Sequence, residues 1–464
     1  MFGMLSGNRL ELAKPLVDTL GRDDVWAYGR ARARANWTAP SQVGQLITDT
    51  AVFQCGQGGY GDKGTCPKNY GGFEGIEFSC AMGPFAPQSG NDYDCSLRSS
   101  AGLSTSMLID WQDYTHGFRV SSDDGTLDSQ QQTNYLNRTL FKFLAGVANF
   151  YSSYGVKNSS GITNLPDTCA QEMCQLRTAG SHISSESNNH ADLGYARMAV
   201  AKLMQYHREG LIPSLRPEWL DLEASLASYP TVYRPGFGEG FAEAVGPDGT
   251  QPPNLGNTDY PITTFAAIHP AGMIGHESTP EMLEIARNTV WAVNSDNQWH
   301  PNNGFCLAWP PASRVVTRDD GQRLLDAASI AVRTVCFPNY WPDLGGGGLE
   351  NGGAVEAIHS LLLQSHESCL RVFAGWPANR SASFTQLRAR GGFVLSGKQI
   401  AGVVGGINVT SELGGDLSFC LPHGWSAVNA TCEGVAVQPT LTNATLRRYR
   451  IKTMVGQRCI LSAA

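Results

Sequence analysis

The hydrophobic pattern of the 464-residue chain changes near Pro377, and this change constrains the fold most strongly. Before it, apolar residues recur at helical spacing in successive segments, which are separated by long loops. After it, short alternating apolar runs lie between turns, as at residues 393–395, 400–404 and 407–410, which is typical of antiparallel strands. A chain of this length is expected to form about two to three domains. We therefore predict a mainly α-helical domain over residues 1–377 and a small antiparallel β-sandwich domain over 378–464.

A glycine-rich segment interrupts the helical pattern over residues 36–103. It holds four of the twelve cysteines, Cys55, Cys66, Cys80 and Cys95. The chain has no Cys-x-x-Cys pair, so a structural zinc site is not expected, and we predict neither a metal nor a cofactor. Long loops inside compact domains usually have a function of their own or are special to a family. We predict a loop insertion that disulfides hold in place.

The distribution of Asn-x-Ser/Thr sequons points to the secretory pathway. An even cysteine count and repeated sequons together indicate disulfides and N-glycans. The first residues lack the basic and apolar segments of a signal peptide, so we expect such a peptide upstream of Met1. We predict a secreted or lumenal glycoprotein. The predicted N-glycosylation sites are Asn36, Asn137, Asn158, Asn379, Asn408, Asn429 and Asn443.

Charge and hydropathy exclude two classes of partner. The net charge is −7 and the isoelectric point is near 5.8, which argues against nucleic acid as the main partner. No apolar run approaches the roughly 20 residues that a membrane-spanning helix needs. Signatures of metalloproteases, P-loop proteins and nucleophile-elbow hydrolases are also absent. The remaining chemistry is that of carboxylates on loops beside aromatic side chains, which is usual in carbohydrate hydrolysis.

A glycine-rich run at residues 345–353 contains Glu350 and Asn351 and is followed by an amphipathic helix. Ala354, Ala357, Ile358, Leu361 and Leu362 recur on one side of this helix, and Glu356, Ser360 and Gln364 lie on the other. One interpretation is that Glu350 is a carboxylate favoured near a helix N-terminus. The other is that it is a carboxylate held at the lip of a pocket.

Four further residues are candidates for a role at a site or at a helix end. Asp192 near a helix start either stabilises the helix dipole or faces a pocket. Glu172 is either a solvent-facing acid beside a Cys169–Cys174 bridge or part of a site. Trp341 could stack on a sugar. For His366, which follows the helix of residues 354–364, the simplest role is a C-terminal cation or cap.

Several segments together resemble family 95 of the glycoside hydrolases, the inverting α-L-fucosidases and their α-L-galactosidase relatives. The closing segments are 357–367 (Ala-Ile-His-Ser-Leu-Leu-Leu-Gln-Ser-His-Glu), 370–377 (Leu-Arg-Val-Phe-Ala-Gly-Trp-Pro) and 387–394 (Leu-Arg-Ala-Arg-Gly-Gly-Phe-Val). The upstream segments also match the family in their order and spacing. They are 8–16, 269–272, 278–289 and 304–309. The resemblance implies an (α/α)6 toroid of antiparallel helices followed by a β-sandwich, and fucosylated glycans as ligands. It also implies that Glu350 corresponds to the aspartate that activates the attacking water, and Asn351 to its neighbour.

The chain departs from the family in three respects. The resemblance places the general-acid glutamate and the water-positioning asparagines upstream of Met1. The histidine-rich substrate motif is replaced by Asp-Tyr-Pro-Ile-Thr-Thr at 259–264. Glu350 occupies the position of the family's aspartate, and the loop that carries it is one residue shorter than in the family. Two hypotheses follow: a fucosidase-like hydrolase that is incomplete in this chain, or an inactive relative that binds glycans or has a structural role. An incomplete toroid would expose an apolar flank, so the chain is also expected to self-associate.

Overall fold

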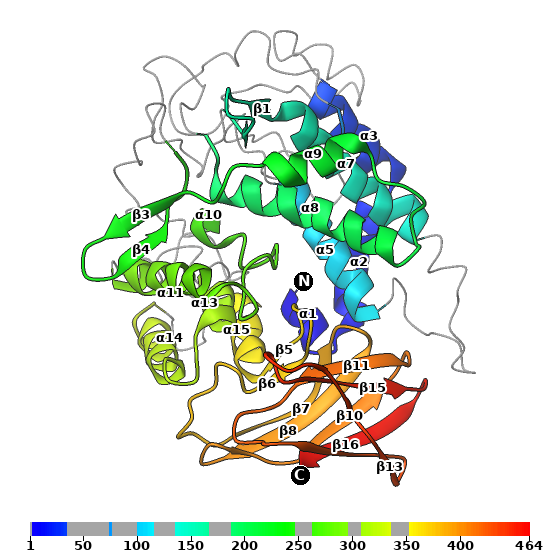
Figure 1. Ribbon diagram of the computed structural model, residues 1–464, viewed down its shortest axis with the longest axis vertical. Coiled ribbons are helices and arrows are strands. Elements are labelled where there is room, and N and C mark those ends of the chain that lie inside the picture. The colour runs from blue at the N-terminus through cyan, green and yellow to red at the C-terminus, as the bar shows by residue number, and fades with distance from the viewer. Residues whose placement is uncertain are drawn as a thin grey trace. The chain divides into compact units, whose positions relative to one another are not determined.

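The computed structural model describes residues 2–34, 74–76, 100–115, 135–166, 187–245, 262–295, 308–335 and 352–464 (Figure 1). The chain divides into two compact units. Unit 1 comprises residues 1–14, 109–133 and 274–464, and unit 2 comprises residues 15–108 and 134–273. Most of the predicted insertion, including its four cysteines, lies outside the described residues. The predicted domain boundary after residue 377 is a different division and stays a prediction.

Unit 2 is built mainly from helices. They are α3 (Asp23–Arg34), the π-helical turn η1 (Leu136–Leu140), α7 (Phe141–Tyr154), α8 (His190–Arg208), α9 (Pro217–Ser225) and α10 (Ile262–Phe265), with parts of α2 (Leu10–Leu20) and α5 (Ser100–Thr115). Apolar residues at helical spacing predict helices over residues 133–155 and after Asn189, and most of these side chains are buried, with α7 packed on α8. The sequence offers Asn188 or Asn189 as the N-cap of α8, and the structure shows Asn189, whose side chain accepts a hydrogen bond from the Ala191 amide at 2.8 Å.

Two features of unit 2 differ from the prediction. Apolar residues recur at helical spacing over residues 8–34, which predicts one helix, but the structure breaks it at Gly21 and Arg22 into α2 and α3. The run of residues 229–260 is rich in proline and glycine, which predicts a loop, yet it contains the hairpin β3 (Thr231–Arg234) and β4 (Gly238–Phe241). The strands are short, and the glycines around them hide the alternation that a sequence pattern needs. A second short hairpin pairs β1 (Val156–Lys157) with β2 (Thr163–Asn164).

Unit 1 contains the helices α1 (Phe2–Ser6), α11 (Pro280–Ser295), α13 (Trp309–Val315), α14 (Gly321–Val335) and α15 (Gly352–Leu362). Thr279 followed by Pro280 and Glu281 predicts a helix start with Thr279 as N-cap, and the Thr279 hydroxyl accepts a hydrogen bond from the Met282 amide at 3.2 Å. A short hairpin, β5 (Leu363–Gln364) and β6 (Arg371–Val372), follows α15. Trp309 is buried, as expected from the apolar helical run around it.

The region after α15 is rich in antiparallel sheet, as the alternating runs predicted. One sheet has the order β13 (Val435–Val437), β12 (Val428–Cys432), β16 (Gln457–Ala463), β10 (Ile407–Ser411), β8 (Phe393–Ile400) and β7 (Ala382–Ala389), and β9 (Val403–Val404) also pairs with β8. A second sheet has the order β11 (Gly415–Cys420), β15 (Arg448–Thr453) and β14 (Thr440–Asn443). Figure 1 shows these strands in orange to red.

One hydrophobic cluster joins the two sheets. Leu395, Val409 and Leu461 of the larger sheet belong to it, together with Leu417 and Ile451 of the smaller one. Every second residue of these strands faces the cluster, which is the period of a half-buried strand. The disulfides Cys369–Cys420 and Cys432–Cys459 also lie here. They are compatible with the predicted secretory location.

Candidate functional site

Most of the site residues predicted from the sequence lie outside the described residues. These are Glu350, Asn351, Trp341 and Glu172. What the structure does describe is helix α15, whose first residue, Gly352, follows Asn351 directly in the chain. The surroundings of α15 therefore show what supports the segment on which the functional prediction depends.

The polar side of α15 is buried. Glu356 and Ser360 are each 4% exposed, and Gln364, which follows the helix in β5, is 3% exposed. Ala357 and Leu361 on the apolar side are buried as well, whereas Val355 and Ile358 are 48% and 39% exposed. An amphipathic helix normally turns its charged side to solvent, and no pattern in the sequence indicates that this side is buried here. Buried charge is tolerated only where it is paired and hydrogen-bonded. Partners for Glu356 must therefore come from elsewhere in unit 1.

Glu356 has three partners among the described residues. Arg314 of α13 donates from Nη2 to Glu356 Oε1 at 3.0 Å, and both side chains are about 95% buried. The Ser6 hydroxyl at the end of α1 lies 2.7 Å from Glu356 Oε2, and Ser360 donates to Oε1 at 3.3 Å. Ser6 Oγ also lies 2.8 Å from Nδ1 of His359. We call Ser6, Arg314, Glu356 and His359 the α15 network.

The serine, histidine and carboxylate of this network do not form a nucleophilic triad. In a triad the histidine lies between the serine and the acid, but here Ser6 Oγ bonds to both His359 and Glu356. If Ser6 donates its proton to Glu356, Nδ1 of His359 must carry a proton and donate to Ser6. Burial lowers the pKa of His359, and Glu356 partly opposes this effect. The arrangement therefore fixes α15 to α1 and α13.

A second set of charges surrounds Arg390, which follows strand β7. Arg390 Nη2 contacts Asp110 Oδ1 at 2.5 Å, and Nη1 contacts Asp113 Oδ2 at 3.2 Å; both acids lie on the part of α5 that belongs to unit 1. Burial raises the pKa of Asp110, while Arg390 and then Arg314 act in the opposite direction. Arg390 also donates to the His366 carbonyl at 3.2 Å. This bond connects the charges around Arg390 to the β5–β6 hairpin that follows α15.

Two histidines complete the polar interior. Burial, followed by the charge of Arg371, lowers the pKa of His276 to about 3. Burial and the cations Arg314 and Arg390 likewise lower the pKa of His366 well below its usual value. Both imidazoles are therefore neutral near pH 7. The cationic role predicted for His366 at a helix end is wrong, because partial burial of the imidazole and the nearby charges of Arg314 and Arg390 lower its pKa.

Arg371 is the centre of the third charge group. It contacts Glu277 at 2.9 Å and Glu367 at 2.7 Å. Glu367 Oε1 also accepts from the Glu277 amide at 2.6 Å, so the hairpin after α15 is held to the segment before α11. Sequence reasoning missed all three arginines at the centres of these groups. The only signal was an arginine inside an apolar segment, as at Arg314 and in the Leu-Arg-Ala-Arg run that ends at Arg390.

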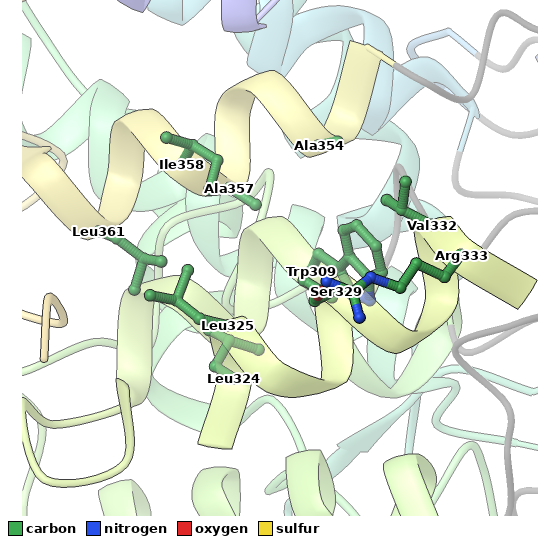
Figure 2. Close-up of a pocket in the computed structure, with 11 residues that line it drawn as sticks. Trp309, Leu324, Leu325, Ser329, Val332, Arg333, Ala354, Ala357, Ile358 and Leu361 are labelled. Carbon is green, nitrogen blue, oxygen red and sulfur yellow. The ribbon is translucent and has the colours of Figure 1, made fainter. Parts of the chain in front are cut away.

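An apolar groove lies on the opposite side of α15 from Glu356. Its volume is about 340 Å³, and it lies between α14 and α15 with Trp309 at its floor (Figure 2). Leu325, Ala357 and Leu361 line it, and Arg333 lies at its edge. It has few polar groups, so it lacks the hydrogen-bonding atoms that orient a sugar. We do not assign substrate binding to it.

Asp192 is the one predicted substrate-binding residue that the structure describes. It lies in the first turn of α8 in unit 2, is fully buried and accepts a hydrogen bond from the Tyr151 hydroxyl at 2.6 Å. Burial raises the pKa of Tyr151 well above 10, and the Asp192 charge adds to this shift. A hydrogen-bonded, buried aspartate is more than a dipole-stabilising surface charge. Its predicted role at a pocket stays a prediction.

The described residues contain no group of three or more histidine, cysteine or acidic side chains placed to hold a metal ion. Among the same residues, no helix combines the length and the apolar character needed to cross a bilayer. Of the seven predicted sequon asparagines, Asn36 lies outside the described residues. Asn443 is half-buried, and the other five are exposed.

Comparisons with known proteins give no family assignment. No protein-family profile matches the chain, and no curated protein matches its sequence. A putative kojibiose phosphorylase from human microbiome is similar in structure at 11% identity and a TM-score of 0.41, over 84% of this chain and 54% of that one. A GH127 β-L-arabinofuranosidase from Geobacillus stearothermophilus T6 has 13% identity, a TM-score of 0.25 and coverages of 81% and 62%.

A third similar structure is the Streptomyces avermitilis α-L-rhamnosidase complexed with L-rhamnose, with 13% identity, a TM-score of 0.31 and coverages of 78% and 37%. The chain thus spans about half the length of the phosphorylase and less of the rhamnosidase. TM-scores of 0.41 and below establish neither a shared fold nor a shared activity.

Proposed function

We propose that the protein is a glycoside hydrolase-like protein of the inverting α-L-fucosidase type, with an (α/α)6 toroid of helices before its β-sandwich. The observation that carries the proposal is that segments of the family resemblance, far apart in the chain, contact one another in unit 1. Arg388 of segment 387–394 donates to Asn8 of segment 8–16 at 2.8 Å. The Arg390 amide donates to Ser365 of segment 357–367 at 3.1 Å.

The α15 network supports the proposed role of Glu350 and Asn351. Catalytic groups must be held by side chains that packing and hydrogen bonds have already fixed. Ser6 and Arg314 hold Glu356, one turn after the start of α15, so the helix that follows the proposed catalytic pair is anchored on its buried side. The substrate-binding roles proposed for Asp192, Glu172 and Trp341 rest on the sequence alone.

The proposed mechanism needs two carboxyl groups on opposite faces of the sugar. Glu350 acts as the general base that activates water, with Asn351 helping to orient it. The general acid that protonates the leaving oxygen is not assigned to a residue of this chain. In inverting enzymes the two groups are about 6.5–9.5 Å apart, which leaves room for the water. The proposed substrate is a glycan with a terminal α-L-fucose.

A kinetic comparison of Glu350 variants tests this proposal. The product of the complete gene, including any general acid that lies outside these 464 residues, is assayed on α-1,2-fucosylated oligosaccharides beside its Glu350→Gln and Glu350→Asp variants. Removing a general base should lower kcat by about 10²–10⁴-fold, whereas the aspartate, the residue found in the family, should retain much of the activity. Equal rates for the protein and Glu350→Gln would remove Glu350 from the mechanism.

The second candidate function is glycan binding without turnover. It is favoured by the sequence at 259–264, where Asp-Tyr-Pro-Ile-Thr-Thr stands in place of the family's histidine-rich motif. Titration calorimetry with the same oligosaccharides separates the two candidates. Binding with no release of fucose would support this second function, and release of fucose would exclude it.

A further inference from the structure

Two predicted glycosylation sequons lie on strands of the larger sheet, and their spacing fits the strand geometry. Asn408 and Thr410 belong to β10, and Asn429 and Thr431 belong to β12. In a strand, residues two apart face the same side, so the acceptor amide and the hydroxyl of each sequon share one face. The intervening Val409 and Ala430 are buried, which places both sequons on the outward face.

Strand pairing brings the two sequons to the same place. Strand β16 lies between β10 and β12. Ile460 of β16 is paired with Asn408 on one side and with Thr431 on the other, and Asn429 is paired with Ser462. Direct cross-strand partners have Cβ atoms about 5 Å apart and diagonal ones about 7–8 Å apart. Both asparagines are therefore neighbours of Ile460, although their positions differ by 21 residues in the chain.

Ile460 needs an explanation because it is apolar and exposed in the middle of the sheet. It is 52% exposed, whereas its neighbours Cys459 and Leu461 are each 2% exposed on the inner face. The same two strands, β12 and β16, are joined on that inner face by the Cys432–Cys459 disulfide. A disulfide indicates an oxidising compartment, which is also where N-linked glycans are added in eukaryotic cells.

We propose that Asn408 and Asn429 both carry N-linked glycans and that the two glycans together cover Ile460 and the outward face of this sheet. In the modification, Nδ2 of each asparagine bonds to C1 of the first sugar of a lipid-diphosphate-linked oligosaccharide. The bond between C1 and the diphosphate oxygen breaks, the diphosphate leaves with the electron pair, and one amide proton is released.

The local geometry is compatible with this chemistry. Both asparagine side chains are exposed. The only hydrogen bond that involves either side chain among the described residues is a long one, 3.5 Å, from Asn429 Nδ2 to the Ala463 carbonyl. A glycosylated amide keeps one N–H, so this contact survives modification. With both glycans attached, other proteins cannot reach the outward face of the larger sheet. Any carbohydrate-binding site therefore lies elsewhere. The inference does not depend on the proposed hydrolase activity.

Glycopeptide mapping of the protein isolated from its native cells tests occupancy. We expect glycans on both Asn408 and Asn429. An unmodified asparagine at either position overturns the proposal. The covering of Ile460 is then tested with protein secreted from a eukaryotic host, by comparing Asn408→Gln/Asn429→Gln with Thr410→Ser/Thr431→Ser, which keeps both sequons.

The readout is retention on a hydrophobic-interaction column. We expect the glutamine variant to be retained longer than the serine control, and Ile460→Ser in the glutamine variant to reverse the increase. If the glutamine variant is not secreted, the folded glycoprotein is compared before and after enzymatic glycan removal, with and without Ile460→Ser. An unchanged retention after glycan loss, or an increase that Ile460→Ser does not reverse, contradicts the covering of Ile460.

Discussion

Unit 1 contains two interiors that are filled in different ways. Between the two sheets, the interior is apolar and closed by two disulfides. Around α15, it holds Arg314, Glu356, Arg390 and Asp110, together with two neutral histidines. The stability of the apolar interior comes from burial of hydrocarbon, which needs no specific partner. The stability of the polar interior requires that each buried charge is paired with an opposite one. We expect the two interiors to respond differently to substitution and to pH.

The largest effect is expected from Arg314→Met. This change leaves Glu356 buried and without its cation, which typically costs about 3–5 kcal/mol of stability. The matched control is the double variant Arg314→Met/Glu356→Met, which removes both charges and should recover most of the loss. Urea unfolding measures both. If the double variant is as unstable as the single one, charge pairing is not what holds α15.

The second prediction concerns the apolar interior. Leu417 is fully buried in the cluster shared by the two sheets, and Leu417→Ala should cost about 2–5 kcal/mol through lost burial and a cavity. Because no titratable group is involved, the loss should be the same at pH 7 and pH 5.5. A stability loss for Leu417→Ala that depends strongly on pH would contradict the distinction between the two interiors.

The third prediction is a pH dependence that belongs to the α15 interior. The pKa of His276 and that of His366 are lower in the folded protein than the ordinary value of 6.5. The unfolded chain therefore binds more protons between pH 6.5 and about 3, so stability falls as pH falls through this window. His276→Gln and His366→Gln should each reduce the slope of unfolding free energy against pH below 6.5.

Buried carboxyl groups have the opposite effect on the slope of unfolding free energy against pH. Burial raises the pKa of Asp110 and of Glu367, so these groups favour the folded state as pH falls. Comparing each histidine variant with the unchanged protein at every pH cancels their contribution. A glutamine variant with an unchanged slope would show that its histidine is not held neutral by the fold.

The smallest effect is expected from Ser6→Ala. The variant removes a hydroxyl that bonds to Glu356 and His359, and a hydrogen bond to a charged group contributes about 1.5–3 kcal/mol at most. Because Arg314 stays in place, we expect a loss of stability near the lower end of this range, measured from the midpoint of urea unfolding. A loss as large as that of Arg314→Met would mean that α1, rather than α13, is the main anchor of α15.

The apolar interior could be predicted from the sequence and the polar one could not. Alternation at 393–395 and 407–410 specifies both the strands and the side that is buried. Glu356, Ser360 and Gln364 also follow a helical period, but the period does not say which side faces solvent. That depends on Arg314, 42 residues earlier, and on Ser6, 350 residues earlier. Partners this distant leave no local pattern.

The same limit applies to the predicted site. Asp192 follows a recognisable N-cap, so its place in the first turn of α8 was predictable, whereas its bond to Tyr151 on another helix was not. Glu350, Asn351, Trp341 and Glu172 are outside the described residues, so their roles remain proposals that depend on the sequence resemblance.

The most direct test of the central proposal is the configuration of the first sugar released from an α-1,2-fucosylated oligosaccharide, followed by proton NMR before mutarotation. The proposal predicts that the protein releases β-L-fucose, the inverted anomer, and that Glu350→Gln does so far more slowly. Release of α-L-fucose, or binding of the oligosaccharide with no release at all, would contradict an inverting hydrolase built around Glu350.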